Sequence, residues 1–186
     1  MKIAIGISTN RGIKAKTAQS LLQMVSASSY EFQIIIAIEG HTIAENRSYI
    51  AIQALETKCD YLFFVDDDMV FEPDILNRLL KHKKEIIGVV CHSRTLPLVS
   101  IVKLLEENGE ISNDLFKCKV KGTGLLLIDM NVFKKINRPW FNFETYESGL
   151  TKTSEDSWFC QQLKKAELDI WCDATIKVGH IGDYIF

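Results

Sequence analysis

Three consecutive carboxylates, Asp66, Asp67 and Asp68, are the strongest chemical signal in the sequence. They directly follow the apolar stretch Tyr61–Val65, and open α/β sheets bind ligands at the carboxyl ends of their strands. Adjacent carboxylates raise one another's cost of ionisation, and a hard divalent cation with oxygen ligands relieves that cost. In an extended chain Asp66 and Asp68 point the same way, so we expect both to face one ion or ligand. The alternative is a solvated acidic turn that caps the next helix.

The first half of the sequence predicts the strands and helices that would position this triplet. Three apolar, β-branched stretches predict strands covered on both faces: Ile3–Ile7, Phe32–Ile38 and Tyr61–Val65. Apolar positions at helical spacing predict helices over residues 15–25 and 43–55, and Arg47 is the polar exception on the inner side of the second. This order predicts right-handed crossovers and a parallel sheet.

The regular alternation weakens in the second half of the chain. A third helix is expected after Pro73–Asp74, a short one at Asn131–Ile136 and a last one from Ser154, with a loop over Asn137–Thr153. Further strands are expected at Ile86–Cys91, Leu98–Leu104, Phe116–Val120, Leu125–Asp129, Leu168–Cys172 and Thr175–Val178. Arg94 follows the fourth strand and could contact a phosphate or a sugar. Nothing in this order requires a second domain.

Length and composition narrow the class of protein. The chain has 186 residues, of which 47% are hydrophobic and 25% charged, which suits one folded domain and excludes a disordered chain. A net charge of -2 gives no electrostatic footprint for nucleic acid, although a local basic patch is not excluded. No secretory signal or membrane-spanning run is evident, so we expect a cytoplasmic protein. The five cysteines lack metal-binding or disulfide spacing, and we expect mostly buried, reduced thiols.

An Asp-x-Asp sequence after an apolar strand resembles the metal and nucleotide-sugar motif of GT-A-fold glycosyltransferases, particularly those like family 2. The resemblance runs over nearly the whole chain. Residues 3–12 resemble the first strand and the loop that meets the nucleotide base, and Glu39 stands where an acidic residue often lies near the base or ribose. Residues 44–47 are similar to an Ala-Arg-Asn signature close to the diphosphate, but Glu45 occupies the position of its Arg.

The second half carries three further likenesses to the same family. Gly122-Thr123-Gly124 resembles a glycine-containing strand on the acceptor side, although a simple turn before a strand explains it equally well. Glu155-Asp156 resembles the Glu-Asp motif whose Asp is the general base in inverting members, while Ser154 with acidic residues in the first turn is also an ordinary helix start. His180 resembles a late histidine that ligates the metal, and an exposed loop residue is the alternative.

The resemblance implies a single-domain GT-A enzyme over residues 1–186, α/β in class and Rossmann-like, with a mostly parallel central sheet flanked by helices. Residues 1–95 would form the nucleotide-sugar half, and residues 96–186 the mixed acceptor half. It implies Mn²⁺ or Mg²⁺ on Asp66, Asp68 and His180, a UDP- or GDP-sugar donor, and an acceptor that is a saccharide or small molecule. Asp156 would be the base, with Glu155 as an acceptor contact. The implied substrate contacts are Thr9, Asn10, Arg11, Glu39, Asn46, Asp66, Asp67, Arg94, Gly122, Thr123 and Gly124.

Three alternatives stay open at this point. A nucleotidyltransferase could use the same acidic metal site, although the segment Ser8–Lys14 is a poor version of the glycine-rich, basic loop that it needs. A receiver-like signalling module would need acidic residues after the first strand, and the segment Ile7–Asn10 has none. A nucleotide-sugar-binding protein that has lost catalysis is the third.

Overall fold

The computed structural model describes residues 1–38, 41–94, 99–104 and 114–182. One sheet forms its centre, from strands β1 (Lys2–Thr9), β2 (Glu31–Ile38), β3 (Tyr61–Val65), β5 (Ile86–Val89), β6 (Lys103–Leu104), β7 (Leu115–Val120), β8 (Leu125–Asp129) and β11 (Ile170–Asp173). Two short pairs lie outside it, β4 (Met69–Val70) with β12 (Gly179–His180), and β9 (Glu144–Thr145) with β10 (Thr151–Thr153). The helices are α1 (Ala15–Ser26), α2 (Ile43–Glu56), α3 (Ile75–Lys81), α4 (Val132–Lys135) and α5 (Glu155–Lys165).

The sheet has the order β2-β1-β3-β8-β5-β11-β7-β6. Strands β2, β1 and β3 pair in parallel, as the first half of the sequence predicts, and β11 also pairs in parallel with β5. Strand β8 is inserted antiparallel between β3 and β5, and β7 runs antiparallel to β11. The α/β class with a mostly parallel sheet and a mixed second half is therefore confirmed.

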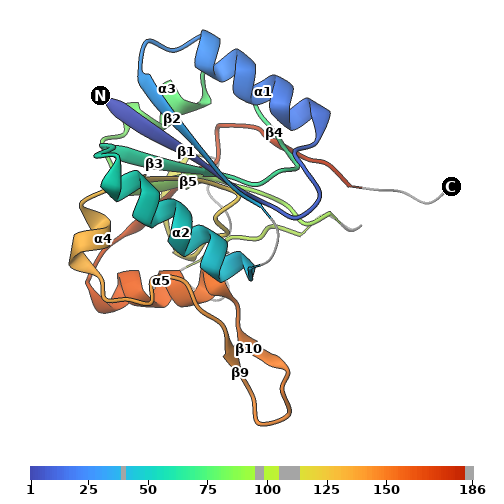
Figure 1. The fold of residues 1–186 in the computed structure, drawn as a ribbon, viewed down its shortest axis with the longest axis vertical. Helices are drawn as coiled ribbons and strands as arrows, with labels where there is room; N and C mark the ends of the chain where they lie inside the picture. Colours follow the sequence, from blue (N-terminus) through green and yellow to red (C-terminus); the bar gives the residue numbers. More distant parts are fainter. Residues whose placement is uncertain (39–40, 95–98, 105–113, 183–186) are drawn as a thin grey trace, which may run out of the picture.

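Helices cover both faces of the sheet, α1 and α3 on one side and α2, α4 and α5 on the other (Figure 1). Side chains of β1 alternate between the two cores, Ile5 toward the α1 side and Ala4 toward the α2 side, and both are buried. This burial on both faces is why the first strands read as continuous apolar runs. All five cysteines are free and buried, and burial raises the pKa of Cys118 and Cys172 to about 12, so these two thiols stay protonated.

Two expected elements are wrong. The segment Asn137–Thr153 is not a plain loop, because β9 and β10 form a hairpin in it, where Gly149 has a φ of 81° that suits glycine in a turn. Thr175–Val178 is not a strand, since the Asp173 carboxylate accepts hydrogen bonds from the backbone and side chain of Thr175 at 2.8 and 2.6 Å and bends the chain there. The last strand is β12 instead.

Other expectations fall partly or wholly outside the described residues. Of the strand expected at Leu98–Leu104, the structure describes residues 99–104, and only β6 within them is a strand. Glu39 lies outside the described residues. No helix in the described part of the chain is long and apolar enough to cross a membrane.

Candidate active site

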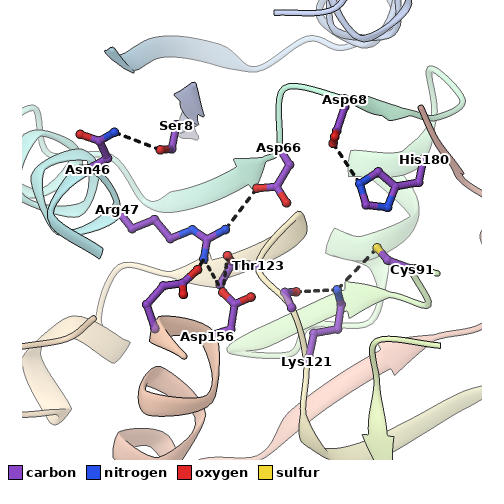
Figure 2. A network of polar contacts seen from close by, with 12 residues as sticks. Ser8, Asn46, Arg47, Asp66, Asp68, Cys91, Lys121, Thr123, Asp156 and His180 are labelled. Carbon is purple, nitrogen blue, oxygen red and sulfur yellow. Dashed lines mark hydrogen bonds and ion pairs between the residues drawn. The ribbon is translucent and has the colours of Figure 1, made fainter. Parts of the chain in front are cut away.

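The acidic triplet begins at the end of β3, in the middle of the sheet. The backbone N–H of Asp66 donates to the Gly124 carbonyl at 2.8 Å, and the Met69 N–H then donates back to the Asp66 carbonyl at 3.4 Å. Asp67 and Asp68 therefore form a turn rather than an extended segment. The expectation that Asp66 and Asp68 point the same way is wrong, because the turn directs the two side chains to different partners (Figure 2).

Asp66 faces a buried arginine. Arg47 belongs to α2, and its side chain is only 3% exposed. Its Nη2 donates to Asp66 Oδ1 at 3.2 Å, while its Nη1 donates to Glu155 Oε1 at 2.5 Å and also to Asp156 Oδ1 (Figure 2). One guanidinium thus joins three carboxylates that come from β3 and the start of α5.

The charges of this cluster are unbalanced. Burial alone would lower the pKa of Arg47, but Asp156, Asp66 and Glu155 raise it above its ordinary value. Burial raises the pKa of Asp66 even though Arg47 opposes the shift. Burial and the neighbouring Asp156 also raise the pKa of Glu155. Three carboxylates around one cation therefore favour a further proton or cation nearby.

The segment between β7 and β8 lies against two of these carboxylates, Asp66 after β3 and Asp156 at the start of α5. Thr123 is fully buried, and its hydroxyl donates to Asp156 Oδ1 at 2.7 Å. A Cβ on Gly124 would lie 2.7 Å from Asp66 Oδ2, so the absence of a side chain lets Asp66 sit against this backbone. A Cβ on Gly122 would lie 3.3 Å from Ile101 Cγ2 and an ordinary 3.6 Å from Asp156 Oδ2.

The start of α5 is the ordinary helix start that the sequence also allowed. Ser154 is the N-cap, and its hydroxyl accepts the Ser157 N–H at 3.4 Å. Glu155 and Asp156 stand in the first turn, where the helix dipole favours acidic residues. Both side chains nevertheless turn to Arg47, with exposed fractions of 10% and 24%.

Asp68 lies in a second cluster, with His180 and Arg94. His180 Nε2 is 3.1 Å from Asp68 Oδ1, and Arg94 Nη1 is 2.8 Å from Asp68 Oδ2. The Nδ1 of His180 lies 2.8 Å from the His92 carbonyl oxygen, which suits an N–H donor at Nδ1. Burial opposes ionisation of Asp68, but its bond to His180 lowers the pKa of this carboxyl overall. The same bond raises the pKa of His180.

Asp68 and His180 have the chemistry of cation ligands. A carboxylate and an imidazole suit Mn²⁺, and Mg²⁺ usually takes only one or two protein carboxylates together with substrate phosphate oxygens. Within the described residues, no three His, Cys, Asp or Glu side chains converge as a metal cluster. The pair therefore fits a cation that a substrate phosphate completes, and Asp66 would have to leave Arg47 to join it.

A cavity of about 600 Å³ opens over the triplet. It is lined by Ser8, Thr9, Asn10, Arg11, Gly12, Ile13, Lys14, Ile43, Asp66, Asp67, Asp68, Arg94 and His180. Thr9 donates to Asp67 Oδ2 at 2.5 Å, while Asn10 and Arg11 are exposed. Asn46 is buried behind this wall and donates to Ser8 Oγ at 3.2 Å. The structure thus brings most of the expected donor contacts to one hollow.

Two buried basic side chains, Arg47 and Lys121, were not among the expected site residues. The sequence does mark Arg47 as unusual, because it is a charged residue on the inner side of an amphipathic helix. Lys121 is 1% exposed, and its Nζ donates to the Gly122 carbonyl at 2.7 Å and lies 3.9 Å from Cys91 Sγ. Gly88 makes room for it, since a Cβ there would lie 2.3 Å from Lys121 Cε. No sequence pattern distinguishes Lys121 from an exposed lysine at a strand end.

A larger cavity, of about 880 Å³, lies away from the carboxylates. It is lined by residues of β2, of α2 with the two residues before it, and of the segment 139–143, and among the expected site residues that the structure describes only Asn46 reaches it. Aromatic residues before α5 are expected to fill a core or stack on sugars. Trp140 and Phe141 are buried, and Phe141 stacks on Phe159 at 4.6 Å between ring centroids, so these two belong to the core.

Comparisons with known proteins agree with this architecture. No protein-family model matches the sequence, and no curated protein matches it significantly. Among solved structures, A197 from STIV matches 98% of this chain with a TM-score of 0.69 and 19% identity, and the chain covers 87% of A197. The chain has the GT-A fold.

Two further GT-A-like matches carry ligands. S. aureus TarS (residues 1–349), solved with UDP-GlcNAc, matches the whole chain with a TM-score of 0.57 and 11% identity. GalNAc-T7, solved with UDP, GalNAc and Mn²⁺, matches 97% of it with a TM-score of 0.55 and 9% identity. The chain covers only 60% of that TarS segment and 44% of GalNAc-T7. The likeness is therefore one of fold.

Proposed function

We propose that this protein is a glycosyltransferase that moves a sugar from a nucleoside-diphosphate sugar to an acceptor hydroxyl. The observation that carries the proposal is the contact of Arg47 with both Asp66 and Asp156, which are 90 residues apart in sequence. It places the end of the donor-side strand and the acidic helix start at one point. A sugar-transfer site needs a donor-binding acidic group and an adjacent base at such a point.

The donor would lie in the cavity over the triplet. Asp68 and His180 would hold Mn²⁺ or Mg²⁺, with Asp66 toward the ribose or the same ion. The bound cation would offset the charge that develops on the leaving diphosphate. Thr9, Asn10 and Arg11 line the same cavity and are the proposed contacts of the nucleoside, together with Glu39, while Arg94 is proposed to contact the phosphates or the sugar. The ligands of TarS and GalNAc-T7 support this donor class.

Asp156 is the proposed base. Its hydrogen bonds within the described residues fall on Oδ1, from Thr123 and Arg47, which leaves Oδ2 to accept the acceptor's proton. The acceptor oxygen would attack the anomeric carbon as the bond to the diphosphate oxygen breaks, which inverts that carbon. Glu155, Gly122, Thr123 and Gly124 would shape the acceptor side. We propose a saccharide or a small molecule as acceptor.

A screen of UDP- and GDP-sugars with Mn²⁺, read out as nucleoside diphosphate released, tests the donor assignment. We expect Asp68→Ala to abolish metal-dependent donor binding, because Asp68 supplies the carboxylate of the proposed cation site. Asp169→Asn is the matched control, since Asp169 pairs with Lys117 away from the cavity. Unchanged donor affinity in Asp68→Ala would refute the site.

The base is tested separately. At saturating Mn²⁺, Asp156→Asn should keep donor affinity and lose transfer, because an amide oxygen cannot take up the acceptor proton. Full transfer activity in this variant would exclude Asp156 as the base and leave the donor site unaffected.

A further inference from the structure

Arg47 is the only side chain in the described residues that contacts both acidic groups of the site directly. Its two contacts with α5 share Nη1, and its contact with Asp66, the residue after β3, uses Nη2 alone (Figure 2). The planar guanidinium holds these donors in a fixed fork, so a shift toward one carboxylate alters the bonds to the others. A movement of Asp66 therefore changes the position of Asp156 through Arg47, although Arg47 does not line the cavity.

The three bonds are unequal. Nη1 lies 2.5 Å from Glu155, whereas Nη2 lies 3.2 Å from Asp66, which is the most exposed partner at 36% of its side chain. Asp66 is also the partner nearest in sequence to the proposed cation ligand Asp68. A divalent cation arriving between Asp66 and Asp68 would compete with Arg47 for the charge of Asp66. Of the three contacts of Arg47, the one to Asp66 would therefore be the first to break.

We propose that Arg47 is a positioning residue that couples cation binding at Asp66 and Asp68 to the placement of Asp156. While no cation is bound, Arg47 divides its hydrogen bonds between Asp66 and the pair on α5. When a cation takes Asp66, the guanidinium is left to Glu155 and Asp156 and fixes Asp156 Oδ1 together with Thr123. The inference rests on the cation site of the proposed function. It adds that the cation binds Asp66 before Arg47 fixes the position of Asp156.

The coupling is reciprocal, and therefore it can be measured without any transfer reaction. Removing the charge of Asp156 leaves Arg47 with one partner fewer, so Arg47 should pair more strongly with Asp66 and resist the cation. We expect Asp156→Asn to weaken Mn²⁺ binding to the protein alone by about fivefold, the lower end of site-to-site coupling, as measured by electron paramagnetic resonance of free Mn²⁺.

Arg47→Lys separates this linkage from a plain field effect. Lysine keeps the positive charge but has no fork that reaches three carboxylates. In the Arg47→Lys background, Asp156→Asn should change Mn²⁺ affinity less than twofold. Equal weakening in both backgrounds would mean that the Asp156 charge acts directly on the ion, and it would overturn the coupling.

A measurement on the unaltered protein covers the case in which Arg47→Lys does not fold. The side-chain ¹⁵N signal of the buried Arg47 should shift when Mg²⁺ is added to saturation, because its bond to Asp66 is lost. An Arg47 signal that does not move would overturn the proposal. The exposed Arg138 supplies an internal reference.

The two proposals fail in different ways. Coupled Mn²⁺ binding with no affinity for any UDP- or GDP-sugar would refute the donor assignment and leave the role of Arg47 standing. Donor binding and transfer without the Asp156-to-Mn²⁺ coupling would refute the role of Arg47 alone. If Mn²⁺ does not bind even with UDP present, the cation site and the coupling are both wrong.

Discussion

Asp66 and Asp68 are separated by one residue, yet they lie in ion clusters of opposite kind. Around Asp66, three carboxylates share the single guanidinium of Arg47, which is almost completely buried. Around Asp68, one carboxylate meets two basic side chains, Arg94 and His180, and Arg94 is 59% exposed. The first cluster has an excess of negative charge and the second does not.

The pKa directions record the same difference. The pKa of Asp66 is raised by burial, whereas that of Asp68 is lowered by its bond to His180. The turn at Asp67–Asp68 creates this contrast, because it directs Asp66 toward Arg47 and Asp68 toward His180 and Arg94. A triplet of identical residues thus offers one carboxylate in a cluster with excess negative charge and one that pairs with two basic side chains.

Replacing the central cation of each cluster should separate the clusters most clearly. We expect Arg47→Met to lower the free energy of unfolding by about 3–5 kcal/mol, because it removes the buried cation shared by Glu155, which is buried, and by the part-buried Asp66 and Asp156. Arg94→Met should cost less than about 1 kcal/mol, since Arg94 is mostly exposed and Asp68 keeps its contact with His180. Urea unfolding at neutral pH in the presence of a chelator measures both values. Similar losses of unfolding free energy in the two variants would mean that the burial of Arg47 makes no difference between the clusters.

Sequence patterns predicted the parts of the fold that depend on local order. The boundaries of β3 and β8 agree with the expected segments, because continuous apolar runs that end in turn residues admit few alternatives. The hairpin β9–β10 escaped prediction, since its strands are two and three residues long and mostly exposed. The strand β12 depends on pairing with β4, which no local pattern reveals.

The candidate site was predictable in composition and not in its connections. The acidic triplet and the acidic start of α5 stand out by residue type. The position of the triplet at one edge of the sheet was also predictable, because it follows a parallel strand and parallel strands end at the same edge. That Arg47 would join them depends on how α2 and α5 pack against the same face of the sheet. The long-range pairing of Asp68 with His180 across the β4–β12 contact depends likewise on tertiary structure.

The two glycines between β7 and β8 allow a finer comparison of the acidic groups. Gly124→Ala places a Cβ 2.7 Å from Asp66 Oδ2, and Asp66 must rotate away from its contact with Arg47. We expect a loss of about 1–2 kcal/mol in the free energy of unfolding, at the lower end of overpacking costs because one short side chain can move. Gly122→Ala meets the side chain of Ile101 at 3.3 Å and Asp156 at 3.6 Å, both wider than the contact at Gly124, and should cost less. Equal losses of unfolding free energy at the two positions would mean that the close approach of Asp66 is not the reason why glycine is needed at residue 124.

The smallest expected effect is the pH signature of the two carboxylates. Asp68 has a lowered pKa when folded, so its stabilising contribution is present above the unfolded value of 3.8 and is lost as the pH falls through the folded pKa. Asp66 has a raised pKa, so the folded state holds its proton longer and stability falls as the pH rises from 3.8 through the folded pKa. Between pH 3.5 and 5.5, below the range in which His180 titrates in the unfolded chain, the stability advantage of the unaltered protein over Asp68→Asn in chelator should therefore grow, and that over Asp66→Asn should shrink. Urea unfolding across this range measures both slopes, and slopes of the same sign would show that Asp66 and Asp68 share one electrostatic environment.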